Sequence, residues 1–156
     1  FSKALISMAP PDFTNYTQSD FKERLNQRDW GEQDETSSAA NLTEIVLSNF
    51  VLQPNGKIHP KFSRSNHMQV IEAFWNHQPS KLFSGITCPV LYLPARMPGN
   101  ESQRNSMKDD MIRLASKSLT TFNTIWLENS IHDVPIQKPE LLSSIILSEI
   151  DKGFFD

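Results

Sequence analysis

The sequence has 156 residues, of which 38% are hydrophobic, and this length suits one domain with a core of its own. Its 15 Lys and Arg residues against 18 Asp and Glu give a net charge of −3, which argues against general attraction to nucleic acid or to an anionic membrane. No stretch approaches the roughly 18 consecutive apolar residues that a membrane-spanning helix needs, and no secretory leader is visible.

The first half of the sequence favours helices joined by irregular segments. A short amphipathic helix is predicted from Thr17 to Asp29, with Thr17 or Ser19 as its cap. A second helix is predicted from Asn41 to about Val51 and is followed by a turn at 53–56. A third is predicted from Ser65, which we expect to cap it, to Gln78, because apolar residues recur there at intervals of three and four and Pro79 follows.

After Pro79 the pattern becomes that of an α/β protein. Residues 86–95 form a nearly continuous apolar run, which predicts a parallel strand buried on both faces. Residues 102–118 predict a crossover helix, residues 122–127 a second strand, and the segment from Pro139 a final helix with a wide apolar stripe. This order predicts a β-α-β-α unit with parallel strands.

Cys88 and the first residues bear on where the protein resides and on its extent. Cys88 is the only cysteine, so no intramolecular disulfide can form, and we interpret it as a buried strand residue of a cytoplasmic protein. The opening Phe1-Ser2-Lys3-Ala4 has no start-like character. We therefore expect the chain to be a fragment of a longer protein.

His132 is the residue most suited to chemistry. It lies in the loop after the second predicted strand, and open α/β sheets bind ligands at the C-terminal ends of their strands. Imidazole can accept and return a proton near neutral pH, because its unperturbed pKa is about 6.5. The alternative is an ordinary hydrogen-bonded loop histidine. His67 and His77 are ten residues apart, too far for one metal site, and no metal is expected.

Two runs of sequence resemble the end of a known fold. The run Ile86-Thr87-Cys88-Pro89-Val90-Leu91-Tyr92-Leu93 and the later run from Trp126 to Leu141, which contains Ile131-His132-Asp133-Val134-Pro135, are similar to the last two strands and the catalytic-histidine loop of the α/β-hydrolase superfamily. The resemblance covers about residues 80–150. It implies that residues 81–156 are the C-terminal part of an α/β-hydrolase core and that residues 1–80 are a helical lid or cap region.

The resemblance also implies a set of functional residues. His132 would be the catalytic histidine and Glu101 the acid that orients it; the alternative is that Glu101 is a first-turn residue of the following helix and the acid comes from a strand upstream of Phe1. Asp133 is more readily interpreted as a loop-stabilising or capping residue. Phe74, Trp75 and Met97 would bind a small apolar substrate. No cofactor is implied.

The nucleophile elbow of the family is absent from this sequence. The glycines stand at positions 31, 56, 85, 99 and 153, and none begins a G-x-S-x-G pattern. We therefore expect the chain to be inactive alone and the intact protein to be a serine-type hydrolase of an ester, amide or related bond. The alternative is a non-catalytic binding or interaction module of the same fold. The missing neighbour would leave the strand at 88–94 with an open edge, so self-association through that edge or through exposed lid surfaces is expected.

Overall fold

The computed structural model describes residues 2–35, 37, 39–99 and 103–156, and the chain divides into two compact units. The first unit consists of Phe1–Asp29 and Ala39–His77, and the second of Trp30–Ser38 and Gln78–Asp156. The described residues contain both helices and short strands, and two of the three strand pairs are parallel, so the chain is a mixed α/β protein.

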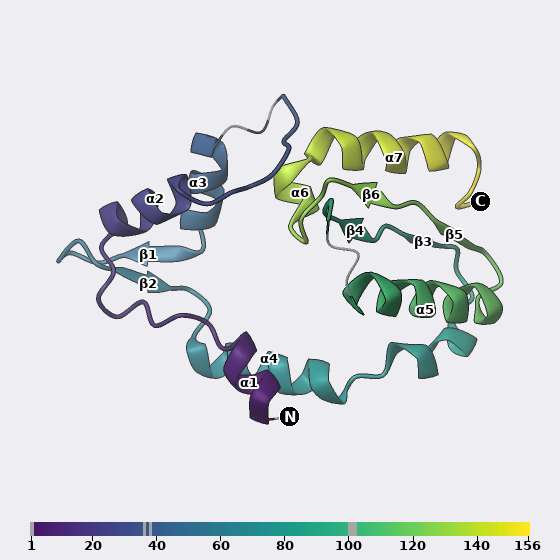
Figure 1. Ribbon diagram of the computed structural model, residues 1–156, viewed down its shortest axis with the longest axis horizontal. Coiled ribbons are helices and arrows are strands. Elements are labelled where there is room, and N and C mark those ends of the chain that lie inside the picture. The colour runs from purple at the N-terminus through teal and green to yellow at the C-terminus, as the bar shows by residue number, and fades with distance from the viewer. Residues whose placement is uncertain (1, 36, 38, 100–102) are drawn as a thin grey trace. The chain divides into compact units, whose positions relative to one another are not determined.

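The first unit combines helices with one β-hairpin (Figure 1). Its elements are α1 (Ser2–Met8), α2 (Gln18–Asn26), α3 (Ala39–Leu47), β1 (Phe50–Leu52), β2 (Ile58–Pro60) and α4 (Arg64–Asn76). Helix α2 begins as predicted at Thr17, whose hydroxyl accepts a hydrogen bond from the Asp20 N–H while the Asp20 carboxylate accepts one from the Thr17 N–H. This reciprocal arrangement is a capping box.

Two details of the predicted helices in this unit were wrong. We predicted the second helix to extend to about Val51, but α3 ends at Leu47 and Phe50–Leu52 forms β1, paired with β2 in antiparallel register. The ring of Phe50 packs against those of Phe13 and Phe21, with ring centroids 5.0 and 4.7 Å away, and this packing outweighs the helical spacing. We also expected Ser65 to cap α4, whereas the cap is Ser63, whose hydroxyl accepts from the Asn66 N–H.

The second unit contains the predicted β-α-β-α order. After two short 3₁₀ turns its elements are β3 (Val90–Tyr92), β4 (Ala95–Arg96), α5 (Gln103–Ser118), β5 (Phe122–Thr124), β6 (Leu127–Glu128), α6 (Val134–Gln137) and α7 (Pro139–Asp151). The strands run between α5 and α7 (Figure 1). Strands β3 and β5 are parallel, and so are β4 and β6, which confirms the prediction of parallel strands joined through a helix.

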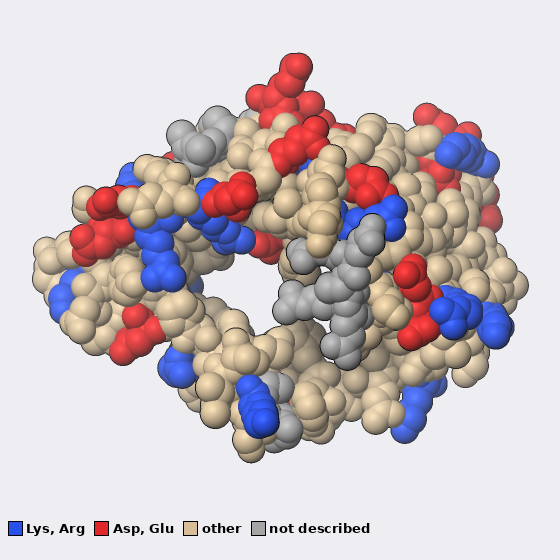
Figure 2. All heavy atoms as spheres, viewed as in Figure 1, with Lys and Arg blue, Asp and Glu red and all other residues tan. Residues whose placement is uncertain are grey.

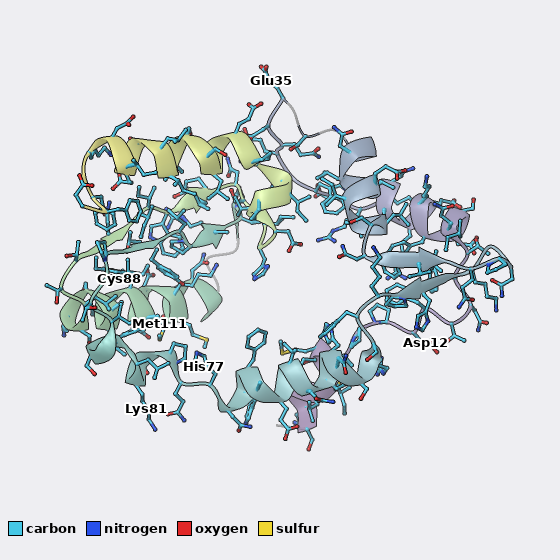
Figure 3. The ribbon with its side chains drawn as sticks, turned by 180° about the vertical axis from the view of Figure 1, so that it is seen from behind. Asp12, Glu35, His77, Lys81, Cys88 and Met111 are labelled. Atoms are coloured by element: carbon cyan, nitrogen blue, oxygen red, sulfur yellow. The ribbon has the colours of Figure 1, made fainter. Side chains whose placement is uncertain are left out.

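Each predicted long strand is in fact two short ones. The run at 86–95 was expected to be continuous and buried on both faces, but it pairs only from Val90, breaks between Tyr92 and Ala95, and is half-buried. Pro94, which faces the partner strand, has no N–H to donate to it, and this accounts for the break. Cys88 consequently precedes β3 and is exposed rather than buried (labelled in Figure 3).

Candidate functional site

The paired strands behave as one ladder despite their breaks. The N–H groups of Ile125, Leu127 and Ser130 donate to the carbonyls of Tyr92, Pro94 and Arg96 at 3.1, 2.9 and 3.0 Å. Bonded residues alternate along a parallel strand, so the backbone groups of Leu91, Leu93 and Ala95 face the opposite edge. Among the described residues of the second unit, no strand pairs with that edge.

His132 lies immediately beyond the C-terminal end of this ladder. The last ladder bond is made by Ser130, and two residues later the imidazole of His132 is fully exposed. Its Nδ1 is 3.3 Å from Oδ1 of Asp133. Asp133 is the residue before α6, and its side chain makes no capping hydrogen bond there. The expected placement of His132 after the second strand is therefore what the structure has.

A cleft of about 650 Å³ is lined by residues of both strands of the ladder and reaches His132. This volume is in the range of small-molecule sites. Its lining is mainly apolar, and none of the described residues that line it is Asp or Glu: Tyr92, Leu93, Pro94, Ala95, Arg96, Met97, Asn105, Lys108, Leu127, Ser130, Ile131, His132, Val134, Pro135 and Leu142. The cleft therefore brings His132 and Met97 to one surface of the second unit.

Lys108 of α5 contributes a positive charge to this cleft. Its ammonium donates a hydrogen bond to the carbonyl of Ala95, which is one of the backbone groups that face the open edge. A lysine at the edge of a sheet discourages pairing with another strand, because its charge would have to be displaced. Lys108 thus covers part of an edge that the strand order leaves open.

The histidine loop is fixed by side chains that follow it in sequence. Gln137, which is 0% exposed, accepts a hydrogen bond from the Ile131 N–H at 2.8 Å and donates to the Trp30 and Glu32 carbonyls at 2.9 and 2.8 Å. The next residue, Lys138, is also buried and donates to the Glu32 carboxylate at 3.0 Å. Residues 30–32 and the histidine loop are thereby joined across a long separation in sequence.

Charges around this junction are paired. The hydrogen bond from Lys138, followed by one from Asn129, holds the pKa of Glu32 below its ordinary value. Asn129 itself adopts a left-handed backbone conformation with φ of 52°, which asparagine tolerates better than most residues.

Asp34 accepts hydrogen bonds from the N–H groups of Glu140 and Leu141 and so satisfies the first turn of α7. The side chain of Glu35 extends outward from the same loop (Figure 3).

An ion pair occupies the region just past the first strand. Arg96 makes a bidentate pair with Glu128, with nitrogen-to-oxygen distances of 2.5 to 2.9 Å, and its guanidinium lies 4.7 Å from the centroid of the Trp126 ring. The hydrogen bonds from Arg96 hold the pKa of Glu128 below its ordinary value. Over the face in view, acidic and basic side chains are interspersed (Figure 2). The carboxylate of Glu128 is thus paired with the guanidinium of Arg96.

The other site residues predicted from sequence lie elsewhere. Phe74 and Trp75 belong to α4 of the first unit, where their exposed fractions are 66% and 55%. Glu101, the predicted acid, lies outside the described residues. Sequence reasoning did not identify Gln137, Lys138 or Glu32. Their only signal was the run Gln137-Lys138-Pro139 before the final helix, and its meaning depends on partners a hundred residues away.

No group of three or more His, Cys, Asp or Glu side chains in the described part of the chain is arranged to hold a metal ion. No helix in residues 2–35, 39–99 and 103–156 is both long and apolar enough to cross a membrane.

The second unit thus defines a mixed α/β arrangement with a histidine at the end of a parallel strand pair, beside a cleft. In comparisons with known proteins, no family model, no curated protein and no solved structure matches this chain.

Proposed function

We propose that this chain provides the general-base histidine of a serine-type hydrolase of the α/β-hydrolase kind. The observation that carries the proposal is the position of His132: a fully exposed imidazole, just beyond the end of a parallel strand pair, on the wall of a cleft. The resemblance of residues 80–150 to the last two strands and histidine loop of that superfamily supports the same role. The mainly apolar lining suits a small apolar substrate with an ester, amide or related bond.

His132 would transfer a proton twice in each cycle. The imidazole would remove the proton from a serine hydroxyl as this attacks the substrate carbonyl, and would then deliver it to the leaving group. The serine and the donors that stabilise the oxyanion would come from a segment outside this sequence, which has no G-x-S-x-G. The open strand edge beside the cleft is where such a segment would dock.

The acid that orients the imidazole has two candidates. Glu101 follows the first strand at the position that the resemblance implies. Asp133 is supported by its distance of 3.3 Å from Nδ1 of His132. Because adjacent residues in a chain rarely hold a ring in a fixed orientation, we retain Glu101 as the proposed acid, which would replace Asp133 at Nδ1 and leave Nε2 for the serine hydroxyl.

We also propose a cytoplasmic location. Cys88 is the only cysteine of the chain and its thiol is exposed. An exposed thiol without a partner persists best in a reducing compartment.

The proposal is tested on the intact protein with a fluorophosphonate probe, which reacts with activated serines. His132→Ala should lower the rate of labelling by about 10²–10⁴-fold, and added imidazole should restore part of it. The matched control is His59→Ala, which removes another exposed imidazole, from β2, and should leave the rate unchanged. Equal labelling of the His132→Ala variant and the unaltered protein would contradict the proposal, and no labelling of either would favour a binding module.

A further inference from the structure

Gln137 is the most completely buried polar residue of the second unit that makes contacts with the histidine loop. Its side-chain amide is 0% exposed, and a buried amide without hydrogen bonds would be costly. Its carbonyl oxygen accepts from the N–H of Ile131, the residue next to His132, at 2.8 Å. Its nitrogen donates to the carbonyl of Asn129 at 3.4 Å, so one side chain binds the loop on both sides of Ser130.

The same amide also binds a distant segment. Its nitrogen donates to the carbonyls of Trp30 and Glu32 at 2.9 and 2.8 Å, and because it has two hydrogens, the longer bond to Asn129 shares one of them. The approach is close because residue 31 is glycine: a Cβ added there would lie 3.2 Å from Nε2 of Gln137 and 3.3 Å from Cε of Met97, and the backbone φ is +66°. Only glycine adopts that conformation readily. Gln137 is therefore held from two sides.

A second set of bonds reinforces the first. Glu32 accepts hydrogen bonds from Lys138 at 3.0 Å and from Asn129 at 3.2 Å, and Lys138 also donates to the Glu128 carbonyl at 3.3 Å. Residues 30–32 are thus joined to the end of the second strand, to the histidine loop and to the start of α7. Among the described residues, the imidazole itself has the polar contact with Asp133 and no other, so its position depends on the backbone that carries it.

We propose that Gln137 is a positioning residue for His132, which fixes the backbone of residues 129–131 against residues 30–32 and so sets where the imidazole meets its substrate. The inference rests on the proposed function of His132. It adds that reactivity depends on an amide that never touches the substrate, and on a segment that the sequence places in the predicted lid region.

The test compares two buried polar groups of the second unit in the intact protein. Gln137→Leu removes every bond of the amide, while Glu149→Gln alters a buried polar residue of α7 that has no contact with the histidine loop. Labelling by the fluorophosphonate is followed over a range of probe concentrations, which separates binding from reaction. In Gln137→Leu we expect the maximal rate to fall by about 10²-fold with half-saturation unchanged, as for a misplaced catalytic group. Glu149→Gln should change neither.

A second variant and a measurement on the unaltered protein cover the case in which Gln137→Leu does not fold. Gly31→Ala pushes on Gln137 from the other side and should lower the maximal rate in the same way. In the unaltered protein the Ile131 amide should exchange with solvent far more slowly than an exposed amide. Free exchange at Ile131 overturns the inference, and so does a Gln137→Leu rate equal to that of Glu149→Gln.

The outcomes separate this inference from the proposed function. If His132→Ala leaves labelling unchanged, the role of His132 is wrong. If His132→Ala abolishes labelling and Gln137→Leu does not slow it, the function stands and only the positioning role of Gln137 is wrong.

Discussion

Glu149 of α7 accepts a hydrogen bond of 2.8 Å from the side-chain amide of Asn123 on β5 and so joins the last helix to the strand pair. A bond from Lys152 and then the one from Asn123 hold the pKa of Glu149 below its ordinary value of 4.5. Because the folded-state pKa is the lower one, the charged carboxylate stabilises the fold above pH 4.5, and this contribution is lost as the pH falls through the folded-state pKa.

Glu149→Gln should therefore make the free energy of unfolding less dependent on pH in the acidic range. We expect urea denaturation between pH 3 and 7, roughly the range over which carboxylates titrate, to show a smaller loss of stability on acidification in this variant than in the unaltered protein. Lys152→Ala removes the larger cause of the lowered pKa of Glu149, so the loss of stability on acidification should occur at higher pH. Parallel curves for all three proteins would contradict the assigned role of Glu149.

Leu42 should be essential to the packing of the first unit. It lies in α3 with an exposed fraction of 1%, and Leu42→Ala should lower the free energy of unfolding by about 2–5 kcal/mol. Ile45, one turn further along the same helix, is 45% exposed, so Ile45→Ala should cost much less. Thermal and urea denaturation of the two variants check this, and equal losses would show that the side-chain packing of α3 is assigned wrongly.

The capping box of α2 makes a separate prediction. Thr17→Ala removes the hydroxyl that accepts from the Asp20 N–H at 3.2 Å and should cost about 1 kcal/mol of stability. Thr17→Ser keeps the hydroxyl and should restore most of it. Circular dichroism during denaturation measures both, and a Ser variant as unstable as the Ala variant would mean that the cap is not the cause.

The open strand edge predicts that the 156-residue chain associates with itself. Leu91, Leu93 and Ala95 direct backbone groups to that edge, and Lys108 covers only the Ala95 carbonyl. We expect light scattering to show a mass that rises with concentration, and Lys108→Ala to increase it further. A monomer at every concentration, for both proteins, would refute association through the edge.

Local sequence patterns predicted the helices better than the strands. The helix predicted over 102–118 corresponds to α5 at Gln103–Ser118, because its apolar spacing is a property of the segment alone. The strand predicted over 86–95 is shorter and broken, because Pro94 interrupts donation to the neighbouring strand. Strand β1 at Phe50–Leu52 was missed for a different reason. Its position depends on contacts with Phe13 and Phe21, which helical spacing does not register.

The residues of the candidate site also differ in whether local sequence could predict them. His132 was found from its place after a strand, and this depends only on residues near it in sequence. Gln137 was missed because an amide at the end of a short helix carries no signal until its partners Trp30 and Glu32 are known. The boundary predicted at residue 80 assigned residues 30–38 to the first half, whereas they belong to the second unit. Long-range hydrogen bonds of this kind are set by the tertiary fold.

The second unit is discontinuous in sequence, and this limits how it can be dissected. A polypeptide that begins at Gln78 would lack Trp30–Asp34, which would deprive Gln137 of two acceptors, Lys138 of its carboxylate and the first turn of α7 of the Asp34 side chain. Such a polypeptide should fold poorly by itself, yet a short synthetic peptide covering residues 30–38 should bind to it and rescue its fold.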